Sequence, residues 1–297
     1  MIRLLLPLSL PLSLLLAACP GEAPMPRADS AADHSVTLFD GPGPGHEAHP
    51  VVDTGSPLVD KGVSAVDSKP KPDLPQTGVV PPLSGSSGGS GGSVAPSGIK
   101  TTLGGVTFNL VVPSTYQASK KSAALIIYSG TEGADVMTQN MLSVAPYVGL
   151  GDLIIAVLDG TTYFGNGQAG ATVLDQVRAR YNIDNDRTYL LSESAGTSAG
   201  LQLGLQLRQS YFAAYWANDV NASATPSATA AQLGFAPWGN AGPGGQLATA
   251  TAIVAGMKSA GYRLPADAPY SGAGSTQHGS PQQFMAAVSF FKGKSRQ

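Results

Sequence analysis

The stretch that decides the fold is Tyr189-Leu190-Leu191-Ser192-Glu193-Ser194-Ala195-Gly196. Its apolar start and its run of small residues predict a buried strand that enters a tight turn, with Ser194 at the tip, and continues into a helix. This is the layout of a nucleophile elbow, G-x-S-x-G, with Ser192 in place of the first glycine. The string alone is common, so the prediction depends on the strand and helix around it. The alternative is a serine that only caps a helix.

Apolar runs alternate with helical spacing from about residue 98 onward. The first predicted strand has an alternating pattern and is expected at the sheet edge, whereas the next two are continuously apolar, as in strands buried on both faces of a parallel sheet. Alternating strands and helices predict an α/β fold, with a mostly parallel sheet flanked by helices. The predicted strands are 106–112, 123–128, 153–158, 187–191, 212–217 and 233–238, and the predicted helices are 134–148, 171–181, 197–208, 246–260 and 281–291. Residues 98–297 are a normal length for one domain.

His278 is the only histidine of this domain, because His34, His46 and His49 precede it. A serine needs a base to become a nucleophile, and His278 stands in a loop just before the last predicted helix. Nucleophile before base is the chain order of one hydrolase fold. The sequence therefore predicts that Ser194 attacks and that His278 transfers the proton.

Backbone N–H groups are expected to stabilise negative charge on the reacting oxygen. Ala195 follows the nucleophile at a helix N-terminus and presents one such group. The second is expected from Thr131, in the loop 129–133 after the strand 123–128, where two glycines allow a close approach of the backbone. The sequence thus predicts an oxyanion site made of two main-chain amides.

The segment from Tyr181 to Gly196 resembles the nucleophile region of α/β-hydrolases of the polyhydroxybutyrate depolymerase and feruloyl esterase type. Members read Y-x-I/V-D-x-x-R-V-Y-x-x-G-x-S-A-G-G. The segment 258–262 and the His278 loop are similar to the same family, and the resemblance covers nearly all of 100–292. It implies an α/β-hydrolase fold with an eight-stranded-type sheet, a Ser–His–acid triad and ester hydrolysis.

The triad acid is where the resemblance fails. The family carries an aspartate in the turn after the strand that here ends at Trp238, but Gly242 stands at that position. Asp219, after the strand 212–217, could supply the carboxylate from the neighbouring strand end, and Asp267 is a second candidate. Otherwise the site is a Ser–His dyad or is inactive, and Asp219 is a solvated turn residue.

An inactive α/β-hydrolase fold that binds at the cell surface is therefore the alternative to a serine esterase. It is favoured by the missing aspartate and by three further departures from the family pattern, at Ser129, Ser192 and Thr197. A metal-dependent hydrolase is disfavoured, because the domain has one histidine and no carboxylate cluster at ligand spacing. No metal or other cofactor is expected.

The connection between the strands 212–217 and 233–238 is short and rich in Ala, Ser and Thr. It leaves little or no room for a lid. We expect an open site that suits short esters or the chain ends of polymers.

The N-terminus predicts export. A basic start and a Leu-rich run to Leu16 are too short and too interrupted by proline for a membrane span, which is typical of a signal peptide over 1–18. The run ends Leu16-Ala17-Ala18-Cys19, which resembles the lipobox of bacterial lipoproteins, so Cys19 is the expected lipidation site. Several acyl chains would hold the protein at the bacterial cell envelope, outside the cytoplasm. The alternative is an ordinary signal peptide with an incidental cysteine.

Residues 19–97 lack apolar periodicity and include the Ser/Gly run 84–93. Such composition buries too little apolar surface to offset chain entropy, which predicts a disordered tether. The net charge is −2, and 12% of the residues are charged. The chain has no block of basic residues, so nucleic-acid binding has no electrostatic basis. The expected partners are an ester substrate, small or polymeric, and the membrane.

Overall fold

The computed structural model describes residues 82–92, 98–220, 222, 238–241, 244–259, 264 and 268–296. The predicted signal peptide, Cys19 and the predicted tether up to residue 81 lie outside these ranges. So do Gly242, Asp267 and most of the connection that the sequence predicted to be too short for a lid.

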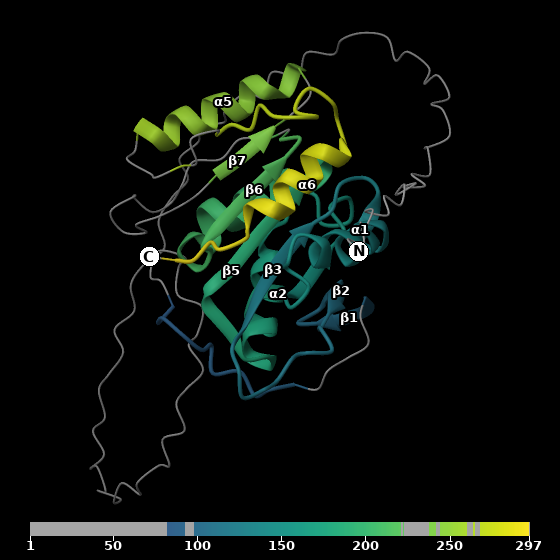
Figure 1. Ribbon diagram of the computed structural model, residues 1–297, viewed down its shortest axis with the longest axis vertical. Helices are drawn as coiled ribbons and strands as arrows, with labels where there is room; N and C mark the ends of the chain where they lie inside the picture. The colour runs from purple at the N-terminus through teal and green to yellow at the C-terminus, as the bar shows by residue number, and fades with distance from the viewer. Residues whose placement is uncertain are drawn as a thin grey trace, which may run out of the picture. The chain divides into compact units, whose positions relative to one another are not determined.

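Seven strands form one mixed, mostly parallel sheet in the described part of the chain (Figure 1). Their order is β1-β2-β4-β3-β5-β6-β7. The bounds are β1 Ile99–Leu103, β2 Val106–Val111, β3 Ser122–Tyr128, β4 Ile154–Leu158, β5 Ile183–Glu193, β6 Ala214–Asn218 and β7 Trp238–Ala241. The pairs β1–β2 and β2–β4 are antiparallel, and the other pairs are parallel. The fold class is the predicted one, with seven described strands in place of the eight that the resemblance implied.

β1 is the strand that the sequence analysis missed. Its sequence is IKTTL, and its side chains are exposed or half-buried, so it contains no apolar run to detect. It pairs along the whole of β2, from Ile99 opposite Leu110 to Leu103 opposite Val106. The strand predicted at the sheet edge is therefore the second strand, and the edge is formed by β1.

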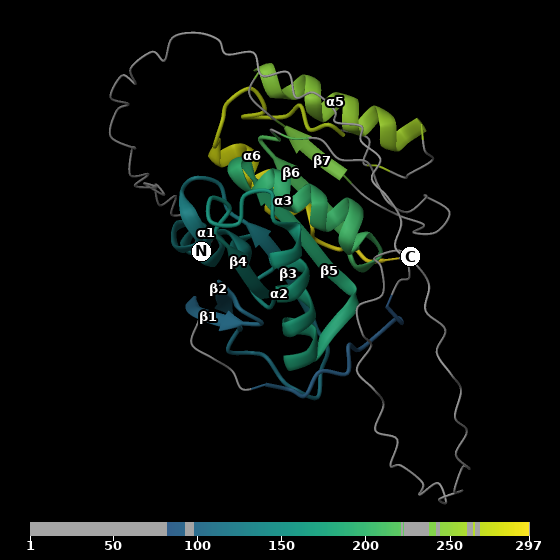
Figure 2. The same cartoon turned by 180° about the vertical axis from the view of Figure 1, so that it is seen from behind.

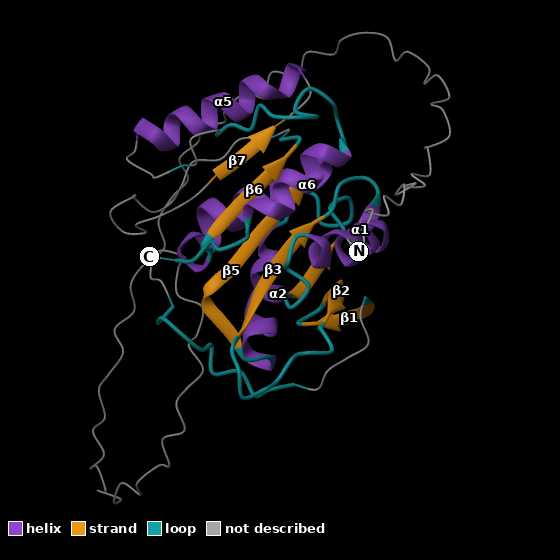
Figure 3. Ribbon diagram, viewed as in Figure 1, coloured by secondary structure: helices purple, strands orange, loops and turns teal. Residues whose placement is uncertain are grey.

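Helices cover both faces of the sheet (Figures 1, 2 and 3). Their bounds are α1 Gly133–Tyr147, α2 Gly167–Arg180, α3 Thr197–Gln202, α5 Gly244–Ser259 and α6 Pro281–Phe290. α1 and α6 pack on one face with Leu125 and Ile127 of β3, while α2, α3 and α5 share a core with Ala124 and Ile126. This alternation explains why β3 reads as a continuous apolar run. None of the helices in the described ranges is both long and apolar enough to cross a membrane.

Residues 82–92, which we call the N-terminal strap, lie against the domain although their composition predicted a tether. Ser87 N–H donates to the Ile183 carbonyl at 2.8 Å, and Asn185 N–H donates to the Gly85 carbonyl at 2.8 Å. Backbone and hydroxyl groups make these contacts. A segment that lacks apolar residues can still form them. The ordered domain therefore begins before residue 98.

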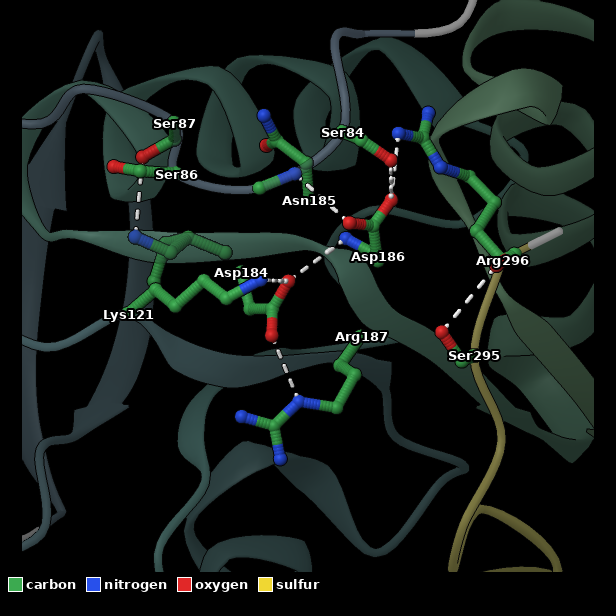
Figure 4. Close-up of polar contacts among 12 residues, drawn as sticks. Ser84, Ser86, Ser87, Lys121, Asp184, Asn185, Asp186, Arg187, Ser295 and Arg296 are labelled. Atoms are coloured by element: carbon green, nitrogen blue, oxygen red, sulfur yellow. Dashed lines mark hydrogen bonds and ion pairs between the residues drawn. The ribbon is translucent and has the colours of Figure 1, made fainter.

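Asp186 joins the strap to the C-terminal end of the chain (Figure 4). Its carboxylate accepts hydrogen bonds from Ser84 Oγ at 2.9 Å, from Gly85 N–H at 2.8 Å and from Arg296 Nη2 at 3.0 Å. Arg296 also donates to the Pro82 carbonyl at 2.7 Å. Burial opposes ionisation, but the hydrogen bonds from Gly85 and Arg296 outweigh it and lower the pKa of Asp186.

A substitution at Gly89 tests whether the strap packs against the rest of the domain. A Cβ at Gly89 would collide with the carbonyl oxygen of Tyr181 and lie 2.6 Å from that of Arg178. We expect Gly89→Ala to lower the free energy of unfolding by about 1–3 kcal/mol, as overpacking does, and to speed proteolysis within 82–92. Urea unfolding and limited proteolysis measure the two effects.

Ser90→Ala is the matched control, because the neighbouring residue already carries a Cβ. It should change the free energy of unfolding by less than about 0.5 kcal/mol. Equal stability of Gly89→Ala and Ser90→Ala would show that the strap does not pack as described.

Candidate active site

The elbow begins where β5 ends. Glu193 is the last residue of the strand, Ser194 has a positive φ of 41°, and a short 3₁₀ turn over Ser194–Gly196 leads into α3. A positive φ is uncommon in a residue other than glycine and occurs where the backbone must turn sharply. The strand, turn and helix thus follow one another in the predicted order, with Ser194 at the turn.

Glycines let the loop after β3 press against the elbow. The Ser129 carbonyl oxygen would collide with a Cβ at Gly160 and would lie 2.5 Å from a Cβ at Gly196. The Ser129 hydroxyl accepts a hydrogen bond from Gly160 N–H at 3.1 Å. The Ser129 hydroxyl therefore holds this loop to Gly160, while its carbonyl packs against the turn that follows Ser194.

Ser192, which replaces the first glycine of the elbow, fits between Tyr215 and Gly200. Its Oγ lies 2.9 Å from the Tyr215 hydroxyl, within hydrogen-bonding distance. Gly200 of α3 faces the same side chain, and a Cβ there would collide with Cβ of Ser192. Because Gly200 has no side chain, there is room for the Ser192 side chain at the position where the elbow pattern has a glycine.

The two predicted oxyanion donors lie on the two sides of Ser194. Ala195 is in the 3₁₀ turn directly after it. Thr131 is in the loop whose neighbouring residue, Gly130, would bring a Cβ to 3.3 Å from Ser194 Cβ. Among the described residues, the Thr131 amide donates to no acceptor, whereas Gly130 N–H donates to Glu132 Oε1 at 2.9 Å. The Thr131 amide is therefore available to another acceptor.

Asp219 follows β6 and faces His278. The distance from His278 Nδ1 to Asp219 Oδ2 is 3.5 Å, and Asp219 is fully buried with a φ of 48°. β5 and β6 pair in parallel with Glu193 opposite Asn218, so Ser194 and Asp219 leave the sheet side by side. The structure brings Asp219 and His278 together. It records no hydrogen bond between His278 and Ser194, both of which are described.

The comparisons with known proteins bear on the fold. No protein-family model matches the chain, and the search of curated proteins gives no match. A thermostable esterase matches with a TM-score of 0.52 and 16% identity, over 67% of this chain and 62% of that protein. The fold is that of an α/β-hydrolase.

Two further solved structures match less well. A fluorophosphonate-binding serine hydrolase of Staphylococcus aureus has a TM-score of 0.43 and 11% identity, over 63% of this chain and 92% of its own. A ferulic acid esterase of Anaeromyces mucronatus has a TM-score of 0.42 and 11% identity, over 63% and 83%. Both scores are below 0.5, so the assignment of the α/β-hydrolase fold rests on the thermostable esterase and on the sheet order.

Two residues that the sequence analysis did not select hold Asp219 in this α/β-hydrolase fold, and Asn218 holds one of them. Gly279 N–H donates to Asp219 Oδ2 at 2.6 Å, and Gln283 Nε2 donates to Oδ1 at 2.9 Å. Gln283 Nε2 also donates to Asn218 Oδ1 at 2.5 Å. A glutamine on the otherwise apolar face of the helix after the histidine loop was the available signal, because a fully buried amide needs partners.

Two glutamates make the surroundings of Ser194 acidic. Burial raises the pKa of Glu193 well above its ordinary value, and the neighbouring Asp219 raises it further. Burial of the Glu132 carboxyl, which folds back onto Gly130, raises its pKa too, while hydrogen bonds from backbone N–H groups, including that of Gly130, act in the opposite direction.

A cavity of about 450 Å³ lies beside the loop that carries Thr131 and Glu132. Asp135, Asp159 and Lys100 also line it, so carboxylates outnumber ammonium groups. Within the described ranges, no three His, Cys, Asp or Glu side chains are placed to hold a metal ion. The cavity offers room for part of a substrate next to the predicted oxyanion loop.

The pair of Ser192 and Gly200 can be tested by substitution. Gly200→Ala should lower the free energy of unfolding by about 1–3 kcal/mol, because the new methyl group collides with Ser192 and lies 2.9 Å from the Tyr215 hydroxyl. In the double variant Ser192→Gly/Gly200→Ala part of this loss should be recovered, since one obstacle is removed. Urea unfolding of the four proteins of the double-mutant cycle measures the coupling. Additive effects would contradict the described contact.

Proposed function

We propose that the protein is a serine hydrolase of carboxylic esters, with Ser194 as nucleophile, His278 as general base and Asp219 as triad acid. The observation that carries the proposal is the position of Asp219. Its carboxylate is 3.5 Å from His278 Nδ1 and leaves the sheet beside the strand that ends at the elbow. A carboxylate so placed can substitute for the aspartate that the family has where this chain has Gly242.

The proposed reaction uses each group in turn. Ser194 Oγ attacks the ester carbonyl carbon while His278 Nε2 takes its proton and then gives it to the departing alcohol. The N–H groups of Ala195 and Thr131 stabilise the negative oxygen of the tetrahedral intermediate. Water, activated by the same histidine, releases the acid and restores Ser194. Asp219 orients the imidazole and stabilises its cation.

His278 is half-exposed, which suggests that a bound substrate brings it into its final contacts. The His278 side chain is 49% exposed, and catalytic hydrogen bonds are often long before substrate binds. An ester in the site would displace water from this side chain and shorten its contacts. The missing hydrogen bond between His278 and Ser194 is therefore compatible with the proposal.

We propose uncharged esters, small or at the ends of polymers, as substrates. Glu132 lies at the elbow and lines the cavity together with Asp135 and Asp159. An anionic substrate would be repelled by these carboxylates, most strongly where water is excluded. The cavity beside Thr131 would receive the part of the ester next to the reacting carbonyl.

Fluorophosphonate labelling tests the nucleophile, because the probe reacts covalently with an activated serine. The wild type should label and Ser194→Ala should not, as measured by mass spectrometry of the labelled peptide. No labelling of the wild type would favour the inactive, binding-only alternative. Equal labelling of Ser194→Ala would assign the reactivity to another residue.

The triad acid is tested by Asp219→Asn. We expect kcat for a short ester to fall on the order of 10³–10⁴-fold, because the amide no longer stabilises the imidazolium or holds its tautomer. Asp267→Asn is the matched control and should leave kcat unchanged. A large loss in Asp267→Asn, with little loss in Asp219→Asn, would reverse the assignment.

We further propose that the protein is exported and held at the bacterial envelope by lipid on Cys19. The strap pairs near the first residues of β5, whereas Ser194 follows the last residue of the same strand. A membrane anchor on the N-terminal side of the strap would therefore join the domain at the end of β5 away from the elbow.

Cys19→Ser tests the anchor. The variant should leave the membrane fraction and appear in the soluble fraction, because the thiol that would carry the lipid is gone. Membrane fractionation with immunoblotting measures this, and a metabolically incorporated fatty-acid probe should label the wild type alone. Membrane retention of Cys19→Ser would rule out the lipid anchor.

A further inference from the structure

A pair of buried carboxyl groups lies behind the proposed triad. Glu193, directly before Ser194, is 7% exposed, and Asp219 is 0% exposed. Asn218 and Gln283 link the two: Asn218 Nδ2 donates to Glu193 Oε2 at 2.6 Å, and Gln283 Nε2 donates to both Asn218 Oδ1 and Asp219 Oδ1. Two buried carboxylates in one hydrogen-bonded cluster would repel each other strongly if both were charged, which favours one shared proton. The chemistry of the site depends on which residue holds it.

The hydrogen-bond donors favour charge on Asp219. Its oxygens accept from Gly279 N–H at 2.6 Å and from Gln283 Nε2 at 2.9 Å, and His278 Nδ1 lies 3.5 Å away. Donors that face a carboxylate stabilise its charged form. In the described residues, a single amide, Asn218 Nδ2, donates to Glu193 Oε2, at 2.6 Å.

Asn218 is oriented so that it can only donate to Glu193. Its Oδ1 accepts from Trp216 Nε1 at 3.0 Å and from Gln283 Nε2 at 2.5 Å, which leaves Nδ2 facing the glutamate. Glu193 Oε2 is thereby an acceptor. This leaves Oε1 as the oxygen of Glu193 that is free to carry a proton.

We propose that Glu193 is a positioning residue, held as a neutral carboxylic acid whose O–H donates to Asp219 and keeps the negative charge of the pair on the carboxylate that faces His278. The consequence for catalysis rests on the proposed function. The location of the proton does not, because it can be measured without turnover.

The charged groups around Glu193 act in the same direction. Asp219, at the end of β6, and Glu132, in the loop between β3 and α1, both add to the effect of burial and raise its pKa, while the Asn218 amide opposes them. His278 faces Asp219 rather than Glu193. The folded protein therefore binds a proton at Glu193 that the unfolded chain releases above its ordinary pKa of 4.5. It follows that Glu193 makes stability fall as pH rises above that value.

Glu193→Gln tests the proton directly, since a glutamine amide reproduces the neutral acid. Its Nε2 can donate to Asp219 and its Oε1 can accept from Asn218. Infrared spectroscopy of the full chain at neutral pH should show a protonated-carboxyl band in the wild type that is absent in Glu193→Gln. The band should persist in Glu132→Gln, the matched control. Urea unfolding from pH 5 to pH 8 should give a shallower loss of stability in Glu193→Gln than in the wild type.

Turnover separates positioning from packing. Glu193→Ala removes the proposed Glu193 donor to Asp219 and should lose activity on the order of 10²-fold, as misplaced groups do, while Glu193→Gln should rescue most of it. A band that survives in Glu193→Gln, an unchanged stability slope, or equal damage by Gln and Ala would each overturn the proposal. If the wild type fails to label with fluorophosphonate, the proposed function fails, but the band and the slope still decide where the proton lies.

Discussion

The parallel pairing of β5 with β6 is the constraint on which the candidate site depends. Its register sets Glu193 opposite Asn218, and the next residue of each strand is Ser194 or Asp219. Since successive side chains of a strand point to opposite faces, a shift of one residue would turn Asn218 away from Glu193 and move the carboxylate. The sheet therefore determines that Ser194 and Asp219, the proposed nucleophile and acid, meet at one edge, although 25 positions separate them in the chain. His278 then reaches them from the loop before α6.

Close backbone contacts, rather than large side chains, hold the rest of the site. The Ser129 carbonyl packs where Gly160 and Gly196 have no Cβ, and Ser192 occupies space that Gly200 leaves. These contacts explain how the chain departs from the family pattern without losing the elbow. The serine at residue 192 requires a residue without a side chain at Gly200, eight positions further along the chain. The strap follows the same rule, because Gly89 packs against carbonyl groups near the end of α2.

Much of the fold could be predicted because apolar patterns report burial directly. β3 and β4 are buried on both faces and read as continuous apolar runs, and α1 and α2 showed helical spacing. β1 was missed because its exposed side chains carry no such pattern. Residues 82–92 were assigned to the tether for a related reason. Composition measures how much apolar surface a segment can bury, whereas the strap is held by backbone amides, serine hydroxyls and the carboxylate of Asp186.

The sequence by itself determined the elbow around Ser194 and left His278 as the single candidate base of the domain, because both are properties of local spacing and of counting. For the triad acid, the sequence left Asp219 as one of two candidate aspartates. The tertiary structure decided which of these residues meet, bringing Asp219 to His278 and adding Gln283, Asn218 and Glu193 behind it. The physical reason is that a carboxylate's role depends on its donors, its burial and its charged neighbours. These are set by strand pairing and helix packing, which no local pattern encodes.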